Sequence, residues 1–340
     1  MTATLDALPA PTTVAGLPLS SRFVMAPMTR KHSPGGVPTA EVAAYYRRRA
    51  EGGVGLIITE GALVGHHSAS HETNVPRMTP GPAEAGWRAV TEAVHQANGR
   101  IAAQLWHLGS ERGAGAWTPS TMRGGDFQEI LDAYGESVRT AVRAGFDAVE
   151  IHAAHGYLLD EFLWPLTNRR TDRYGGDVRR RATFPVEVIK TVKAELPAGV
   201  PLIVRFSQFK ERDYTARIAE TPAELATILE SFATAGADVL HASQRRFWEP
   251  IFAGHHENLA GWAKRITGLP AITVGSVGLT RAFLTSPQRD DLLKRHANDE
   301  FDLVALGRIL LANPHWVRLA AEGRTEEIRD YRKADEDILY

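Results

Sequence analysis

The chain of 340 residues contains no cysteine. This absence excludes disulfide bonds, cysteine nucleophiles, zinc sites built on thiolates and iron–sulfur clusters held by thiolates. It also favours a reducing compartment, because secreted domains of many kinds use disulfides.

The chain also has almost no net charge, with a formal value of -1 at pH 7. It has no basic excess that would attract nucleic acid and no acidic excess typical of a disordered tail. No run of about 18 uncharged apolar residues is present, so no membrane span is predicted. The first residues lack the basic start and apolar run of a signal peptide, and we therefore expect a cytoplasmic protein.

What the sequence does have is a hydrophobic fraction of 44% and a regular series of short apolar runs. Runs of this kind, alternating with helical segments, are typical of parallel strands buried on both faces. Eight of them predict an α/β fold, either a closed (β/α)8 barrel or a large doubly wound sheet. The expected strands are Phe23–Met28, Val54–Thr59, Ile101–Trp106, Ala148–His152, Leu202–Phe206, Ala237–Ala242, Ala271–Val274 and Phe301–Leu306.

No linker rich in glycine, serine or proline interrupts this series, so a single domain is expected over residues 1–340. It would have a short N-terminal lead-in and a tail after about residue 320.

Polar and glycine residues gather where the expected strands end. In a barrel of this kind the active site lies at the carboxyl ends of the strands. Strands four and five are expected to end at His152 and Arg205. Arg205 follows an apolar run, and an arginine in that place needs an anionic or aromatic partner.

The glycines after strands seven and eight allow two interpretations. Gly275 and Gly307 could form plain turns between a strand and a helix. Together with Arg308 they also match the phosphate site common in these barrels. There, backbone N–H groups hold the dianion and a guanidinium adds charge-assisted hydrogen bonds.

His152 and His155 could also be a pair of metal ligands. A metal site needs at least three ligands, and no carboxylate cluster accompanies these two residues in the sequence. We therefore predict no metal. The remaining loop histidines are expected to be solvated: His66, His67, His71, His255 and His256.

Several longer segments carry a clear family resemblance. They are SRFVMAPMTR (21–30), LIITEGA (56–62), QLWHLG (104–109), FDAVEIHAAHGYLLDEFLWPLTNRRTDRYGG (146–176), VRFS (204–207) and VALGRILLANP (304–314). From Leu17 to about Arg318 the chain resembles the Old Yellow Enzyme family of flavin ene-reductases. The resemblance implies a (β/α)8 TIM barrel, FMN as cofactor, NADPH or NADH as hydride donor, and electron-poor alkenes or quinones as substrates.

The resemblance also implies a set of FMN-binding residues. Those expected at the flavin ring are Ala26, Pro27, Met28, Thr29, Gly61, Gln104 and Arg205. Those expected at the phosphate are Gly275, Ser276, Gly307 and Arg308. The Thr29 hydroxyl would tune the flavin, and Arg205 would stabilise negative charge on the reduced ring.

For the substrate, the resemblance implies that His152 and His155 donate hydrogen bonds to a carbonyl or nitro oxygen. That oxygen gains charge as hydride arrives, so these donors act mainly in the transition state. Tyr157 would protonate the α-carbon, and Trp106 would form part of the pocket wall.

Two segments depart from the family pattern. The segment between Gln104 and Asp126 is shorter than usual, which predicts a more open mouth to the site. The segment Arg245–Trp248 is bulky, cationic and aromatic, and it is either a packed surface loop or a wall of the binding site.

Two other functions stay open at this point. The first is an FMN enzyme of the same barrel type that oxidises or demethylates amines. The second is a non-enzymatic barrel that binds a phosphate ligand, although His152, His155 and Tyr157 together argue against mere binding. The expected partner is a small-molecule substrate, and a homo-oligomer is left open.

Overall fold

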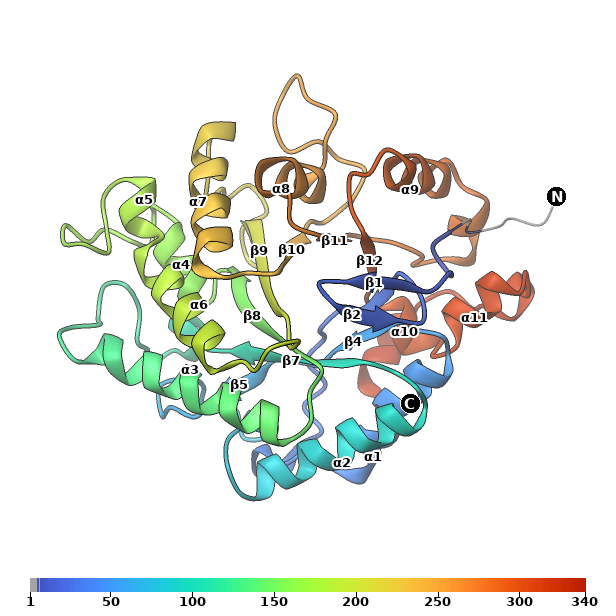
Figure 1. Cartoon of the computed structure of the whole chain (residues 1–340), viewed down its shortest axis with the longest axis horizontal. Coiled ribbons are helices and arrows are strands. Elements are labelled where there is room, and N and C mark those ends of the chain that lie inside the picture. The colour runs from blue at the N-terminus through green and yellow to red at the C-terminus, as the bar shows by residue number, and fades with distance from the viewer. Residues whose placement is uncertain (1–4, 6) are drawn as a thin grey trace.

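Parallel strands close into a barrel at the centre of the molecule (Figure 1). The computed structural model describes residues 5 and 7–340. Within these residues the barrel strands are β3 (Phe23–Met25), β4 (Leu56–Ile58), β7 (Ile101–Trp106), β8 (Ala148–His155), β9 (Leu202–Lys210), β10 (Val239–Ser243), β11 (Ala271–Val274) and β12 (Leu303–Leu306). Each strand pairs in parallel with the next, and β12 pairs with β3. The closed barrel is thereby confirmed over the doubly wound sheet.

Strands β8 and β9 run further than the sequence predicts. They end at His155 and Lys210 rather than at His152 and Phe206. The reason is that the two strands continue to pair beyond the barrel, and after a register shift His155 lies opposite Lys210. Residues expected in a loop are therefore held in an extended ribbon above the barrel end.

Helices surround the barrel (Figure 1). In the described part of the chain they are α1 (Ala40–Glu51), α2 (Pro82–Gln96), α3 (Asp126–Arg143), α4 (Leu158–Leu163), α5 (Val178–Arg181), α6 (Thr183–Glu195), α7 (Pro222–Ala235), α8 (Leu259–Thr267), α9 (Pro287–Ala297), α10 (Ile309–Ala312) and α11 (Trp316–Ala321). Helix α7 shows why such segments start where they do. The Thr221 hydroxyl caps the helix by accepting a hydrogen bond from the Glu224 N–H, and Pro222 occupies the first turn.

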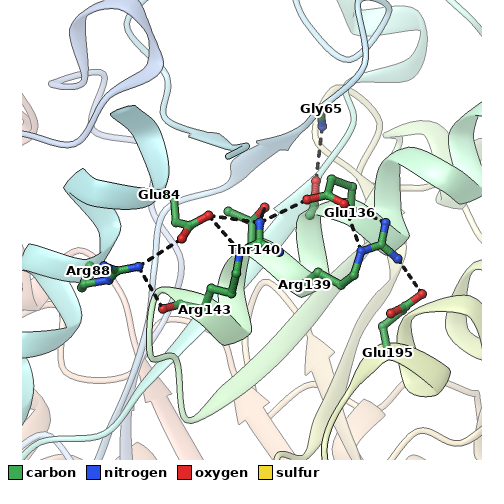
Figure 2. Close-up of polar contacts among 9 residues, drawn as sticks. Gly65, Glu84, Arg88, Glu136, Arg139, Thr140, Arg143 and Glu195 are labelled. Atoms are coloured by element: carbon green, nitrogen blue, oxygen red, sulfur yellow. Dashed lines mark hydrogen bonds and ion pairs between the residues drawn. The ribbon is translucent and has the colours of Figure 1, made fainter. Parts of the chain in front are cut away.

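The outer faces of three helices are joined by charged side chains (Figure 2). We call this set the outer ion-pair network, and its members are Glu84 and Arg88 of α2, Glu136, Arg139 and Arg143 of α3, and Glu195 of α6. Every arginine in it contacts a glutamate, with nitrogen–oxygen distances between 2.6 and 3.1 Å.

The barrel interior differs between its two ends. At the amino-terminal end of the strands it is apolar, and a hairpin of β1 (Thr12–Val14) and β2 (Leu17–Leu19) packs against these apolar residues. Towards the carboxyl end the inward residues become polar, as Glu150, His152 and His241 are all buried there. The polar end is where a ligand site can form.

Two peripheral features complete the fold. Short strands β5 (Ala62–Val64) and β6 (Arg77–Met78) extend the sheet beside β7. The tail after about residue 320 returns to the barrel. There the Arg30 guanidinium donates hydrogen bonds to the carbonyls of Glu336 and Ile338, at 3.0 and 2.8 Å. Among the described helices, none has the length and apolar character needed to cross a membrane.

Candidate functional site

Two adjoining cavities lie at the carboxyl end of the barrel strands. Cavity A, of about 440 Å³, is lined among others by Ala26, Gly275, Ser276, Gly307 and Arg308. Cavity B, of about 280 Å³, is lined by Thr29, Gly61, Gln104, Trp106, His152 and Tyr157. Residues that line both are Pro27, Met28, His155, Arg205 and Glu211. The structure thus brings every site residue predicted from the sequence to one connected region, and their individual roles stay predictions.

Arg205 is a buried cation between the two cavities. Its guanidinium makes one long hydrogen bond, from Nη2 to the Ser243 hydroxyl at 3.4 Å, and its Nε has no partner in the structure. Burial lowers the pKa of Arg205, and the Glu150 carboxylate acts in the opposite direction. A buried guanidinium with an unsatisfied N–H is costly unless a ligand supplies an acceptor. No residue that the structure describes forms an ion pair with Arg205, so its expected anionic partner would be a ligand.

His152 and His155 lie next to each other at the end of β8. Their ring centroids are 5.0 Å apart, with one ring edge-on to the other. Burial, together with the nearby Arg205 charge, holds the pKa of both imidazoles well below the ordinary value, so both are neutral at pH 7.

The two imidazoles differ in what they contact. His155 Nε2 lies 2.8 Å from the Ser243 hydroxyl, whereas the buried Nδ1 of His152 has no hydrogen-bond partner. Of their four ring nitrogens, only Nε2 of His155 hydrogen-bonds a residue that the structure describes. His155 is held in place: its backbone N–H donates to the Ser207 hydroxyl at 3.0 Å, and its φ of 68° is left-handed.

Tyr157 stands at the mouth of cavity B. Its ring packs edge-on against Trp106 and His152, at centroid distances of 4.9 and 5.0 Å. Its hydroxyl donates a hydrogen bond to the Glu211 carboxylate at 2.8 Å. Burial raises the pKa of Tyr157, and the Glu211 charge raises it further, so the phenol holds its proton at neutral pH.

Trp106 explains why residue 61 is glycine. A Cβ at Gly61 would lie 2.6 Å from Cε3 of the Trp106 ring, closer than packed atoms allow. The sequence predicts instead that Gly61 gives room to a flavin. The structure adds a reason within the chain, because the glycine is also needed to seat the tryptophan.

The turns after β11 and β12 form the far end of cavity A. A Cβ at Gly275 would lie 2.6 Å from the Gln244 carbonyl oxygen, whereas one at Gly307 would meet only the Met28 sulfur at 3.8 Å. Ser276 has a left-handed φ of 57°, and its hydroxyl donates to the Arg245 carbonyl at 2.8 Å. The Ser276 hydroxyl proton is thus engaged within the protein, which leaves its backbone N–H as the group that a phosphate could use.

A buried network beneath Gln104 was not predicted. The Gln104 amide nitrogen donates to Glu150 at 2.8 Å, and the other oxygen of Glu150 lies 2.6 Å from His241 Nδ1. This contact directs the amide N–H toward Glu150 and leaves the carbonyl oxygen of Gln104 as the group available to a ligand. The signal in the sequence was a glutamate and a histidine inside apolar strands, at Glu150 and His241.

Two buried carboxylates hold the loops that carry the site. Glu60 accepts hydrogen bonds from the backbone N–H groups of Arg30 and Lys31 at 2.7 and 3.2 Å, directly after Thr29. Burial raises the pKa of Glu60 to about 7. Asp160 accepts from the Gly156 N–H at 2.8 Å and pairs with Lys210 at 2.5 Å.

The sequence predicts that all five loop histidines are solvated. In the structure two of them are not fully exposed. His66 and His255 are half-buried, and only the other three are exposed. His66 is enclosed because it stacks against Trp117, at 4.5 Å between centroids, and contacts Ser68. In the described part of the chain, no three histidine, aspartate or glutamate side chains are grouped as a metal site.

These groups fit a flavin mononucleotide in charge and in donor set. Arg205 Nε, His152 Nδ1 and the indole N–H of Trp106 are buried polar atoms without protein partners along the predicted ring position. At the other end, cavity A offers the turns of Gly275 and Gly307 and the guanidinium of Arg308. The arrangement is that of a barrel built to hold an anionic phosphate at one end and a polar ring at the other.

Comparison with known proteins identifies the family. The sequence profile of the NADH:flavin oxidoreductase / NADH oxidase family matches residues 7–327, and the chain belongs to this family. Its structure is similar to that of Old Yellow Enzyme from Pichia sp. AKU4542, with a TM-score of 0.82 and 25% identity, covering 97% of this chain and 90% of that one.

Named relatives agree with this assignment. The chain is 32% identical to an NADH oxidase of Thermoanaerobacter brockii over 93% of its own length, and it spans about half (51%) of that longer protein. It is 32% identical to an NADPH dehydrogenase of Bacillus velezensis, with 94% of this chain and 95% of the relative covered. Among solved structures, morphinone reductase in complex with tetrahydroNAD matches with a TM-score of 0.80 and 27% identity, covering 97% of this chain and 94% of that one.

Proposed function

We propose that the protein is an FMN-dependent NAD(P)H oxidoreductase that reduces activated carbon–carbon double bonds, with enones, enals, nitroalkenes and quinones as the substrate class. The observation that carries the proposal is the set of unsatisfied buried groups beside Tyr157. Arg205 Nε and His152 Nδ1 lack partners in a region that also presents a protonated phenol. A barrel that only bound a phosphate would not need this combination.

The residues divide the work as follows. The chemistry that bound FMN supplies is hydride transfer, from the nicotinamide donor to the alkene. Arg205 and Gln104 would hold the polar edge of the ring, and Thr29 would hydrogen-bond a ring carbonyl. Arg308 and the turns of Gly275 and Gly307 would bind the phosphate.

The histidines would act on the substrate oxygen. Because His152 is neutral and lines cavity B without a hydrogen bond from its ring to any described residue, its imidazole can donate a hydrogen bond without adding a full charge. Such a donor strengthens as the oxygen becomes negative, and it therefore lowers the barrier rather than only tightening binding. His155, already fixed by Ser243 and Ser207, would define the second side of this oxygen site.

Tyr157 would supply the proton to the α-carbon. Its hydroxyl must leave Glu211 to do so, because one O–H cannot donate to both groups at once. Burial and the Glu211 charge raise the pKa of Tyr157 and keep its proton in place, and Glu211 would hold the hydroxyl between turnovers.

The alternative of amine oxidation finds no support in the site. Arg205 lies between the two cavities, and its positive charge disfavours the approach of a protonated amine. An anionic donor and a neutral, electron-poor substrate suit this surface better.

A spectroscopic experiment tests the proposal. The purified protein with its flavin should be bleached by NADPH or NADH without oxygen, and cyclohexenone should restore the yellow colour with saturated ketone as product. Reduction of the flavin without reoxidation by any enone, nitroalkene or quinone would contradict the proposed substrate class.

A further inference from the structure

The loop after β10 carries an arginine that the proposed function does not use. Phe247 is fully buried, so this part of the departing segment packs into the core. Arg245 and Arg246, by contrast, are exposed and line cavity A. The segment is therefore both a packed loop and a wall of the site.

The loop is fixed against the predicted phosphate turn. The Ser276 hydroxyl donates to the Arg245 carbonyl at 2.8 Å, and the Phe247 N–H donates to the Gly275 carbonyl at 3.2 Å. Asn258 also donates to the Phe247 carbonyl at 2.9 Å. Side chains that leave this loop therefore start from a well-defined backbone.

The two arginines are not equivalent. Arg246 forms an ion pair with Glu249 at 2.8 Å, which compensates its charge. Arg245 makes no side-chain hydrogen bond or ion pair with any residue that the structure describes. Its guanidinium instead stacks on the Tyr214 ring, 3.8 Å from the centroid.

This stacking ties the Arg245 charge to Tyr214, which also lines cavity A. Tyr214 belongs to the loop after β9, the same loop that brings Glu211 to both cavities. The Arg308 guanidinium lies over the Tyr331 ring, 5.3 Å from its centroid. Arg308 and Arg245 therefore both line cavity A without an ion pair to any described residue, and only Arg308 has a predicted ligand, the FMN phosphate.

We propose that Arg245, held on Tyr214, binds a phosphate group of the nicotinamide donor. A guanidinium stacked on an aromatic ring keeps its N–H groups in a fixed plane, which suits paired hydrogen bonds to a phosphate. The exposed Tyr214 ring, with 54% of its surface accessible, adds a flat face beside that charge. The inference rests on the proposed function, because it assumes that a nicotinamide dinucleotide enters this mouth.

The test uses FMN-saturated protein and unreactive donor analogues. Tetrahydro-NADPH and tetrahydro-NADH are titrated while the visible flavin spectrum reports binding. Arg245→Gln is compared with Arg246→Gln, which removes the same charge from the same loop but from an arginine already paired with Glu249. We expect Arg245→Gln to raise the dissociation constant about 10-fold and Arg246→Gln to change it by less than about 2-fold.

The two analogues identify the phosphate. Weaker binding of tetrahydro-NADPH alone assigns Arg245 to the 2′-phosphate, and equal weakening of both assigns it to the pyrophosphate. Either result supports the proposal. Adding salt should reduce the difference between wild type and Arg245→Gln, because an exposed charge contact is screened.

Four results would overturn it. These are unchanged affinity in Arg245→Gln, equal loss in both variants, absence of saturable binding of either analogue to wild type, or loss of FMN from Arg245→Gln with unchanged donor affinity. The last would make Arg245 an FMN ligand. If wild type holds FMN but neither NADPH nor NADH reduces it, the proposed function fails. If wild type is reduced and Arg245→Gln behaves like it, only this inference fails.

Discussion

The arginines of the outer ion-pair network are paired with carboxylates, whereas the arginine at the end of the barrel is not. On the helix surface, Arg139 contacts both Glu136 and Glu195, and Arg143 contacts both Glu84 and Glu136 (Figure 2). At the barrel end, Arg205 is buried and leaves a guanidinium N–H without a partner. The exposed arginines are satisfied by the protein, and the buried one is not.

The difference separates structural from functional charge. Exposed charges add little to the free energy of unfolding, whether or not each of them has a partner. A buried charge without a partner is expensive, and a protein keeps such a group where a ligand completes it. Unpartnered buried atoms also occur away from the site, such as Arg49 Nε and the Tyr134 hydroxyl, so Arg205 points to a ligand because it also lines both cavities.

The largest effect should come from Tyr157→Phe, which removes the acid and leaves the ring packing against Trp106. We expect enone reduction to fall on the order of 10²–10³-fold, as loss of a general acid commonly does. Stopped-flow measurement of flavin reduction by NADPH serves as the control and should stay near the wild-type rate. Quinone reduction should survive too, since it needs no protonation of carbon. An enone rate equal to that of wild type would move the proton source to water or to another residue.

Glu60→Gln tests a buried carboxyl whose ionisation lowers the free energy of unfolding. Because burial raises the pKa of Glu60 from 4.5 to about 7, the folded state prefers the protonated carboxyl. The stabilising contribution of that form is complete below pH 4.5 and is lost as the pH rises through 7. Relative to wild type, the variant should gain up to about 3 kcal/mol in free energy of unfolding between pH 5 and pH 8.

Urea denaturation at the two pH values measures this gain. Glu161, whose pKa burial also raises to about 7, remains in both proteins, so the variant should keep part of the pH dependence. Identical pH dependence in both would show that Glu60 is ionised in the folded state over the whole range.

Arg308→Ala removes the free guanidinium at the phosphate end. We expect FMN to bind at least about 10-fold more weakly, because a charge-assisted contact of this kind is worth about 1.5–3 kcal/mol. Fluorescence titration of the flavin-free protein with FMN gives the dissociation constant, and riboflavin, which lacks the phosphate, is the matched ligand. Riboflavin affinity should not change. Equal losses for both ligands would mean that Arg308 acts through the structure of the cavity.

The smallest effect belongs to the outer ion-pair network. Arg143→Ala breaks contacts to Glu84 and Glu136, and we expect a loss below about 1 kcal/mol in the free energy of unfolding. Chemical denaturation at low and high salt is the check, and the loss should shrink as salt screens the network. A salt-independent loss well above about 1 kcal/mol would show that these surface ion pairs add more to the free energy of unfolding than exposed pairs usually do.

The sequence was sufficient for the barrel and for the positions of the predicted site residues. Apolar runs predict the strands. Because the carboxyl ends of parallel barrel strands lie at one end of the barrel, Thr29, Gln104 and Arg205 are predicted to lie close together. The family motifs then supplied the expected roles.

What the sequence did not predict depends on contacts between distant segments. Glu211 meets Tyr157 only because β8 and β9 continue to pair beyond the barrel, and no local pattern reveals that extension. The contact between Glu150 and His241 crosses the barrel interior and depends on side-chain direction. Ser243 likewise gains its role by lying within reach of both His155 and Arg205.

We propose that the unpartnered groups at the barrel end form an FMN site. The most direct test of this proposal is the identity and amount of the cofactor released from the purified wild-type protein, measured by mass spectrometry and by flavin absorbance per chain. We expect the released cofactor to be FMN, approaching one molecule per chain after incubation with added FMN. Release of FAD, or failure of the flavin-free protein to bind added FMN, would contradict it.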